Sequence, residues 1–373
     1  MTKIITTIAV AVAATVGLAA CGSSSSSSST TSSSSAPAST STSAAKTTGG
    51  TLNGAGSTFA APIYQQWGSN LKSQGLTINY NPVGSGTGVA DLQTATVDFA
   101  GSDPALLPAD KKAMKGPVLQ FPVAFGAITV SYNLPGVKTG LKLDGPTIGG
   151  IFSGQIKTWN DPAIKALNPG MNLPSTSITV VHRSDSSGTT NGFTTYLTKV
   201  DPAWKLGASK LIKWPGGTGA SGNSGVAAAV KATAGAVGYV EQAYALINGF
   251  TYAAVKNGSS YVLPTIANTS LAANGVAVPA DLGISTLDSQ TTGAYPIVSQ
   301  TFIDTYEDPC KDGGASSGTA AALKSFLSYA FGAGQATLGS GGSKLPYAPL
   351  TATLAAKDNA QLAKLTCNGS PIS

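Results

Sequence analysis

The chain has 373 residues, with 22 basic and 16 acidic side chains, and charged residues make up only 10% of the total. A typical globular domain has a charged share of about 25%. The basic residues are scattered singly, with no basic block and no interleaved aromatic residues, and this pattern argues against a nucleic acid partner.

Residues 1–20 have the pattern of a secretory signal peptide. A lysine near the start is followed by an apolar stretch from Ile4 to Val16 and then by small residues, and a segment of this kind directs export and is not part of the fold. The run from Leu18 to Cys21 resembles the lipobox of bacterial lipoproteins. We therefore expect Cys21 to become the acylated, palmitate-bearing N-terminus; the alternative is an unmodified thiol that follows a signal peptide.

Residues 21–48 predict a flexible linker. After Cys21 the segment holds mainly serine, threonine and alanine, no aromatic residue, and Lys46 as its only charge. Such a composition cannot bury enough apolar surface to become ordered. As a flexible coil it would have a root-mean-square reach of about 30 Å, which is enough to hold a globular body away from a membrane.

The remaining body of about 320 residues is expected to form two lobes, because it exceeds what one hydrophobic core comfortably holds. Short β-branched runs at residues 76–80, 128–132 and 178–181 alternate with longer helix-like segments. The predicted helices cover residues 62–72, 89–94, 192–199, 225–232 and 319–331. This alternation predicts an α/β fold with mostly parallel sheets flanked by helices.

Three small-residue loops, at residues 54–59, 84–88 and 186–190, each lead into a predicted helix. Each combines a hydroxyl at a plausible N-cap with glycines that let the backbone approach a ligand closely. A helix N-terminus offers unpaired N–H donors and a partial positive charge, which suit an anion. Any one of these loops alone would indicate ordinary capping, but three in one chain favour a shared anion site.

The segment at residues 181–189 follows a β-run and is expected at the carboxyl end of a strand, where open α/β sheets bind ligands. Arg183 can present two parallel donors to an oxyanion, and Asp185 would hold its guanidinium in place. The alternative is an ordinary surface ion pair. His182, the only histidine, is expected to point to the opposite face of the strand from Arg183 because side chains alternate along a strand.

Asp103 follows a strand-like segment and a Gly-Ser turn, and a carboxylate there suits an anion that carries a hydrogen. Phosphate keeps at least one proton near neutral pH and could donate it to Asp103, whereas sulfate has none. A buried acceptor left without its donor costs about 1–3 kcal/mol, and more when it is charged, so such a site would discriminate between the two anions. The alternative is a turn aspartate before Pro104.

Taken together, these motifs resemble the substrate-binding protein of the bacterial high-affinity phosphate ABC transporter. The likeness spans most of residues 51–300 and fades beyond about residue 305. It rests on residues 54–62, 79–80, 84–89, 97–99, 102–103, 120–122, 151–156, 159–161, 183–189, 214–215, 222–226 and 235–241. The family usually has proline at the position of Ala60 and often arginine at that of His182, and neither departure alters the motif around Arg183.

The resemblance implies a two-lobed periplasmic-binding-protein fold, type II-like, which closes on one phosphate ion without a metal or other cofactor. The implied phosphate ligands are Thr58, the Phe59 amide, Ser85, Asp103, Arg183, Ser187, the Gly188 amide and Thr189, with Asp185 orienting the arginine. The first lobe would comprise residues 49–125 and 295–373, and the second residues 126–294.

The resemblance also implies a role and a location. The protein would be a monomer in the periplasm or on the outer face of the plasma membrane, anchored there only by its N-terminal lipid. It would deliver phosphate to the permease subunits of an ABC importer and would not be an enzyme.

Cys310 and Cys367 are the two cysteines of the body. Outside the cytoplasm an isolated pair most often forms a disulfide, and closing this loop would stabilise the fold by about 4 kcal/mol on the chain-entropy model. No histidine or further cysteine accompanies them, so a zinc site is not expected.

Two other functions remain open at this point. A phosphatase or esterase could use the same serine and aspartate residues, but the chain has no Gly-Lys-Ser/Thr phosphate loop, and its single histidine cannot supply a two-metal cluster. The other alternative is a receptor for a different tetrahedral oxyanion, or a surface protein whose pocket has become adhesive.

Overall fold

The computed structural model describes residues 48–372; the predicted signal peptide, Cys21 and nearly all of the predicted linker lie outside this range. The strands are β1 (Gly50–Gly56), β2 (Leu76–Asn81), β3 (Phe99–Ser102), β4 (Val118–Asn133), β5 (Lys142–Leu143), β6 (Thr179–Arg183), β7 (Thr218–Ala220), β8 (Ala236–Glu241), β9 (Thr251–Tyr252), β10 (Ala254–Asn257), β11 (Ser260–Val262), β12 (Val298–Tyr306), β13 (Thr366–Cys367) and β14 (Ser370–Pro371). The helices are α1 (Ala61–Lys72), α2 (Ser85–Thr94), α3 (Pro108–Lys112), α4 (Gly145–Phe152), α5 (Pro162–Leu167), α6 (Gly188–Val200), α7 (Gly222–Ala232), α8 (Gln242–Ile247), α9 (Ile266–Ala272), α10 (Ser317–Phe331) and α11 (Ala352–Leu362), with a 3-10 helix η1 (Ala333–Thr337). No helix within residues 48–372 is long and apolar enough to span a membrane.

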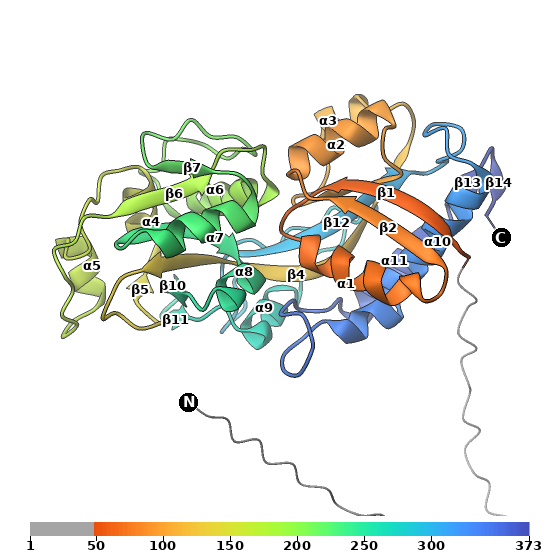
Figure 1. The fold of residues 1–373 in the computed structure, drawn as a ribbon. Helices are drawn as coiled ribbons and strands as arrows, with labels where there is room; N and C mark the ends of the chain where they lie inside the picture. Colours follow the sequence, from red (N-terminus) through yellow and green to blue (C-terminus); the bar gives the residue numbers. More distant parts are fainter. Residues whose placement is uncertain (1–47, 373) are drawn as a thin grey trace, which may run out of the picture. The chain divides into compact units, whose positions relative to one another are not determined.

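The main sheet runs through two lobes in the order β2-β1-β3-β12-β4-β8-β6-β7 (Figure 1). Pairing is parallel among β2, β1 and β3 in the first lobe and among β8, β6 and β7 in the second. The two long strands β12 and β4 are antiparallel to each other and to their outer neighbours. This is the two-lobed periplasmic-binding-protein fold expected from the sequence.

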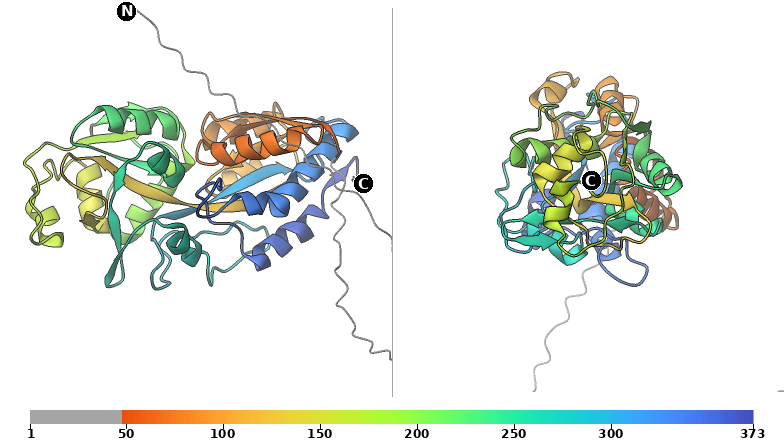
Figure 2. Two further views of the ribbon diagram at one scale, coloured as in Figure 1. Left: turned by 60° about the horizontal axis from the view of Figure 1, so that its bottom comes forward. Right: turned by 90° about the vertical axis from the view of Figure 1, so that its left-hand side faces the viewer.

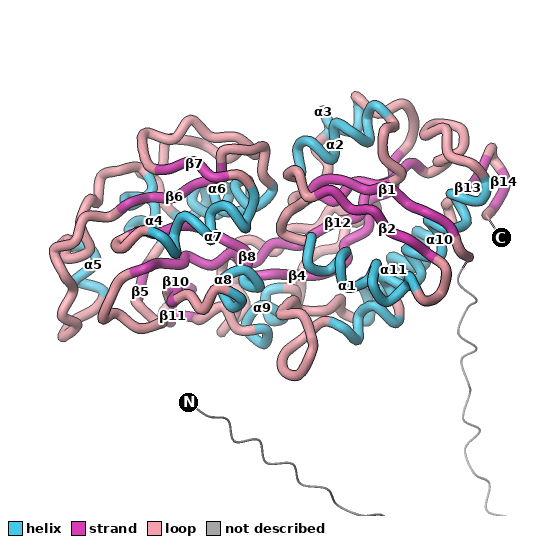
Figure 3. The backbone as a smooth tube through the Cα atoms, viewed as in Figure 1, coloured by secondary structure: helices cyan, strands magenta, loops and turns pink. Residues whose placement is uncertain are grey.

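Strand β4 belongs to both lobes. Its residues up to Ala127 pair with β12, and its residues from Ile128 onward pair with β8. Figure 3 shows this strand continuing from one lobe into the other. The chain therefore passes between the lobes on a strand whose partner changes at one residue.

Helices cover both faces of each part of the sheet (Figure 2). In the first lobe α1 and α10 share an aromatic cluster that includes Tyr64, Trp67 and Phe326, whereas Leu92 of α2 packs in a separate cluster on β3 and β12. In the second lobe Phe193 of α6 stacks on Tyr239 of β8, and α7 buries its valines in a third cluster. Burying a large aromatic or aliphatic side chain contributes about 1.5–3 kcal/mol, so each lobe has a substantial apolar interior.

The predicted strands and helices are present, but the helices at the loops begin earlier than predicted. Helix α2 begins at Ser85 and not at Val89, and α6 begins at Gly188 and not at Gly192. Glycine, serine and threonine have low helix propensity, which is why the pattern placed them in loops. Tertiary contacts override this preference, so the loop residues themselves form the first helical turns.

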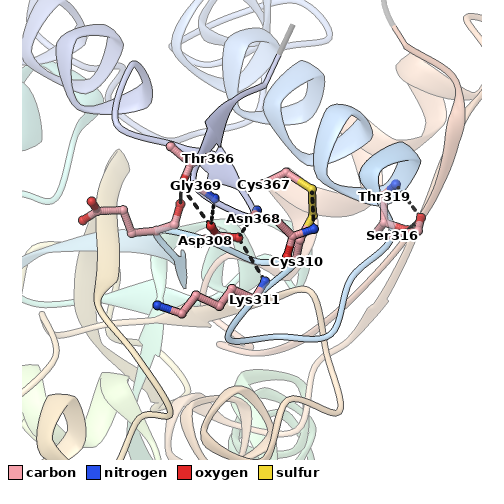
Figure 4. Close-up of a disulfide and its surroundings, with 10 residues drawn as sticks. Asp308, Cys310, Lys311, Ser316, Thr319, Thr366, Cys367, Asn368 and Gly369 are labelled. Atoms are coloured by element: carbon pink, nitrogen blue, oxygen red, sulfur yellow. Dashed lines mark hydrogen bonds between the residues drawn. A yellow bond between two sulfur atoms is a disulfide. The ribbon is translucent and has the colours of Figure 1, made fainter.

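A disulfide joins Cys310 to Cys367, as predicted, with 5.0 Å between the Cα atoms (Figure 4). Beside it, Asp308 accepts hydrogen bonds from the backbone N–H groups of Lys311, Asn368 and Gly369. The bond and this carboxylate together attach the C-terminal β13–β14 hairpin to the segment that follows β12.

Candidate anion-binding site between the lobes

Arg183 is the last residue of β6, and its side chain is buried in the second lobe with 1% exposure. Its Nε donates to Asp185 Oδ1 at 2.7 Å, its Nη2 donates to Asp185 Oδ2, and its Nη1 donates to Thr189 Oγ1 at 3.4 Å. Partial burial acts to raise the pKa of Asp185, but the hydrogen bonds and charge of Arg183 outweigh it, and the pKa is lowered. Asp185 is thus ionised and holds the guanidinium through two hydrogen bonds.

The N-terminus of α6 lies next to this arginine. Ser187 is the N-cap, and its Oγ accepts a hydrogen bond from the Thr190 N–H at 3.1 Å. The Gly188 and Thr189 N–H groups belong to the first turn, where a helix offers no carbonyl partner and carries a partial positive charge. This end of the helix therefore offers several donors to an anion.

Asp103 directly follows β3 in the first lobe and is 1% exposed. Its Oδ1 accepts hydrogen bonds from Ser57 Oγ and from Thr301 Oγ1, the latter at 2.9 Å, and its Oδ2 lies 3.3 Å from Ser85 Oγ. Burial raises the pKa of Asp103, while the hydroxyl donors and the charge of Arg183 act in the opposite direction. One carboxylate oxygen is thus held by two hydroxyls, and the other faces Ser85.

Thr58 and Phe59 precede α1, and Thr58 makes hydrogen bonds to the second lobe. Thr58 Oγ1 accepts hydrogen bonds from Asn223 N at 3.2 Å and from Asn223 Nδ2 at 3.0 Å, and the Thr58 carbonyl accepts one from Tyr244 at 2.7 Å. The Phe59 ring packs in the core against Tyr347. The loop is thereby attached to both lobes.

The lobes meet where the predicted ligands lie. A Cβ atom built on Gly188 would be 1.8 Å from the Asp103 carbonyl oxygen and 2.5 Å from Ser85 Oγ, so only glycine permits this approach. The Gly86 N–H donates to the Ser186 carbonyl at 3.0 Å across the same junction. Contacts at this junction therefore connect seven of the predicted residues, Thr58, Ser85, Asp103, Arg183, Asp185, Gly188 and Thr189. Phe59 and Ser187 adjoin them in the chain, and ligand binding by these residues stays a prediction.

The site is rich in donors. Within residues 48–372, the hydroxyls of Thr58, Ser187 and Thr189 accept hydrogen bonds but have no acceptor for their own hydrogens, and the Phe59 and Gly188 amides have no hydrogen-bond partner. Asp103 is the carboxylate that faces them. Many donors with one acceptor suit a tetrahedral oxyanion that carries a hydrogen.

Sequence reasoning missed three residues of this site. Ser57 and Asn223 lie within motifs already noted in the sequence, but neither stood out from ordinary loop and capping residues. Thr301 lies on β12, 198 positions after Asp103, so no local pattern could have linked the two.

His182 lies outside the site. Its ring stacks on Trp214 with centroids 5.1 Å apart, and its Nδ1 is 3.1 Å from the Arg183 carbonyl oxygen. The alternation of side chains along β6 thus separates the histidine from the arginine, as predicted.

A possible nucleophile motif also proves to be structural. Residues 314–318 have the Gly-x-Ser-x-Gly spacing of hydrolase elbows. In the structure Ser316 is the N-cap of α10 and accepts a hydrogen bond from the Thr319 N–H (Figure 4). Among the described residues, no group of three or more His, Cys, Asp or Glu side chains could hold a metal ion.

Comparison with known proteins agrees with this geometry. Residues 41–333 match the model of the PBP superfamily domain. The phosphate-binding protein PstS of Xylella fastidiosa is 40% identical over 267 residues, which cover 70% of this chain and 73% of that protein. PstS of Haemophilus influenzae is 37% identical, covering 81% and 89%, and PstS 3 of Mycobacterium tuberculosis is 38% identical, covering 78% and 81%.

Solved structures show the same fold at lower identity. A high-affinity periplasmic phosphate-binding protein with bound phosphate superposes with a TM-score of 0.71 at 24% identity, covering 87% of this chain and 96% of that one. A phosphate-binding protein from Stenotrophomonas maltophilia gives 0.65 at 21% identity, covering 87% and 99%. The chain belongs to the PBP superfamily and, within it, to the substrate-binding proteins of the bacterial high-affinity phosphate ABC transporter.

Proposed function

We propose that this protein binds inorganic phosphate between its lobes and selects it against sulfate through Asp103. The observation that carries the proposal is the position of that buried carboxylate among the donors of Thr58, Phe59, Arg183 and α6. A protonated phosphate oxygen would donate to Asp103, while the other oxygens would accept from the donors. Sulfate would place a bare negative oxygen against the carboxylate, which is unfavourable in a buried site.

The remaining ligands follow from the same arrangement. Ser85 and the first turn of α6 flank Asp103 from the two lobes, and Asp185 keeps the Arg183 guanidinium oriented. Relatives that are named phosphate-binding proteins, and a related fold with phosphate bound, support this ligand. The family supports delivery of phosphate to the permease subunits of an ABC importer.

We infer that the first lobe comprises residues 49–125 and 295–373, and the second residues 126–294. The change of partner along β4 between Ala127 and Ile128, and the start of β12 at Val298, support these boundaries. The proposed motion is a closure of the lobes around phosphate, with β4 and the segment that leads into β12 at Val298 as the two crossings.

The location follows from the N-terminal sequence. A signal peptide at residues 1–20 and acylation of Cys21 would place a monomeric receptor outside the cytoplasm, held at the membrane by lipid. Replacing Cys21 by alanine should release the protein from the membrane fraction and abolish palmitate labelling. Retention of both in the variant would contradict the lipoprotein assignment.

Calorimetry of the purified chain with phosphate, arsenate and sulfate tests the proposed ligand. We expect tight binding of phosphate, slightly weaker binding of arsenate and almost none of sulfate. The variant Asp103→Asn serves as the matched control, because it keeps the shape of the side chain and removes its charge. It should reduce the difference between the affinities for phosphate and for sulfate. Sulfate binding comparable to phosphate binding in the unmodified protein would refute the selectivity argument.

An enzyme built on the same site is the alternative function. A chromogenic phosphate ester distinguishes the two, because a receptor would bind free phosphate but would not hydrolyse the ester. Steady hydrolysis that Arg183→Ala abolishes would favour the enzyme.

A further inference from the structure

Asn223 connects the two lobes at the site. It lies in the first turn of α7 in the second lobe and is fully buried. Its Nδ2 donates to Thr58 Oγ1 of the first lobe at 3.0 Å and to Thr189 Oγ1 of the second at 3.2 Å, and its backbone N–H donates to Thr58 Oγ1 at 3.2 Å.

The orientation of this amide is determined by its fourth hydrogen bond. Asn223 Oδ1 accepts from the Glu241 N–H at 2.9 Å. A backbone N–H can only donate, so the carbonyl end of the amide must face Glu241 and the NH₂ end must face the two threonines. The side chain therefore acts on both threonines as a donor.

This arrangement determines which way the threonine hydroxyls point. A hydroxyl group has two lone pairs and one hydrogen. Both lone pairs of Thr58 Oγ1 are taken by Asn223, and those of Thr189 Oγ1 are taken by Asn223 and Arg183. The hydrogens must then point elsewhere, and neither finds an acceptor among residues 48–372.

We propose that Asn223 is a positioning residue for the anion: it makes the hydroxyls of Thr58 and Thr189 obligatory donors and joins the lobes when they are in contact. The assignment rests on the proposed function. It implies that the two ligand oxygens in contact with Thr58 and Thr189 must be unprotonated. A ligand with a hydroxyl group at either position would place its own hydrogen against the hydrogen of the threonine.

The variant Asn223→Asp tests this directly. It keeps the shape and the bond from the Glu241 N–H, but it offers the threonines an acceptor in place of donors, so their hydroxyls would turn away from the anion. We expect phosphate binding at pH 8 to weaken by about 10- to 100-fold. The matched control Ser224→Asp places a carboxylate on the exposed neighbouring residue and should change the dissociation constant much less.

A pH series separates orientation from simple damage to the fold. We expect burial, together with the nearby carboxyl groups of Asp103 and Glu241, to raise the pKa of the introduced carboxyl. Lowering the pH from 8 to 5.5 should then protonate a growing fraction of it and restore one donor, so the ratio of the Asn223→Asp dissociation constant to that of the unmodified protein should fall. The nearby carboxyl groups of Asp103, Asp185 and Glu241 are present in both proteins, so their titration affects both dissociation constants and largely cancels in the ratio. A ratio that stays constant with pH would overturn the assignment.

A double-mutant cycle gives a second test that does not depend on Asn223→Asp folding. Thr58→Val removes the hydroxyl on which Asn223 acts, so adding Asn223→Ala to it should weaken phosphate binding less than Asn223→Ala does alone. Strictly additive losses would overturn the assignment and leave the proposed function intact. If the unmodified protein binds no phosphate at all, the proposed function fails and the assignment fails with it.

Discussion

Arg183 depends on Asp185, two residues later in the chain, for its orientation. The pair is held by two hydrogen bonds, and the arginine also reaches Thr189 at the start of α6. These local contacts could be predicted from the sequence, because all three residues lie within a stretch of seven positions at the end of a β-run.

Replacing Arg183 by alanine should weaken phosphate binding by about 2–5 kcal/mol, because it removes a buried charged donor. Arg183→Lys is the matched control: it keeps the charge but cannot present two parallel donors to Asp185, so its loss should be intermediate. Both values come from calorimetry with phosphate. Unchanged affinity in Arg183→Ala would mean that the site lies elsewhere.

Not every residue of the site could be predicted in this way. Thr301 and Asn223 reach the site through tertiary contacts from β12 and α7, and their identities as threonine and asparagine are common on strands and at helix starts. A single sequence offers no signal that distinguishes these two from residues with only a capping or packing role.

At the scale of elements, α6 begins with a glycine because the other lobe leaves no room for a side chain. Its first turn approaches Asp103 and Ser85 so closely that a Cβ atom would overlap the aspartate carbonyl. The sequence predicted a ligand loop here, yet it could not show that the loop is itself helical, because local propensity favours a non-helical conformation for such residues.

Gly188→Ala should therefore weaken phosphate binding by about 1–3 kcal/mol, as overpacking does, while the higher helix propensity of alanine leaves α6 itself no less stable. Calorimetry and thermal melting without phosphate measure the two effects separately. Gly225→Ala in α7, where the nearest atom to a built Cβ is 3.6 Å away, should leave phosphate affinity unchanged and should raise the melting temperature slightly, because alanine has the higher helix propensity. Normal affinity in Gly188→Ala would contradict the close approach of the lobes.

Helix α11 contains a buried acid without a partner. Asp358 is fully buried, neither carboxyl oxygen has a hydrogen-bond partner within the described part of the chain, residues 48–372, and burial raises its pKa to about 9. In the unfolded chain the group titrates near its ordinary value, so between about pH 4 and pH 9 the folded state holds the extra proton. The stability contributed by this group is therefore present at low pH and is lost as the pH rises through that window.

Asp358→Asn should remove this dependence. Relative to the unmodified protein, the variant should gain about 4 kcal/mol in its free energy of unfolding between pH 5 and pH 8, because the unmodified protein loses about 1.4 kcal/mol per pH unit over this range. Urea unfolding at the two pH values measures this difference. A pH-independent difference would show that the carboxyl ionises normally in the folded protein.

At the scale of the whole molecule, the two-lobed α/β fold and the disulfide could be predicted from the alternation of elements, the length of the chain and the pair of late cysteines. The strand order could not, because parallel neighbours such as β8 and β6 are joined by long connections whose path no local pattern specifies. The joining of both lobes through one strand is likewise visible only in three dimensions.

Strand β13, which carries Cys367 of the disulfide, lies near the end of the first lobe that faces away from the second (Figure 1). Replacing Cys310 and Cys367 by alanine together should lower the free energy of unfolding by about 4 kcal/mol or less, because the 57-position loop is no longer closed. Phosphate affinity measured well below the melting temperature should not change. A large loss of phosphate affinity would show that the disulfide region is energetically coupled to the binding site.

Strand β4 changes partners between Ala127 and Ile128 without a break in the chain. We expect the proposed opening of the lobes to twist the molecule about this strand, so that its backbone hydrogen bonds to β12 and to β8 stay intact on either side of the change. The amides of β4 should then stay protected from solvent deuterium with and without phosphate, and changes in exchange on phosphate binding should be confined to the loops that meet between the lobes.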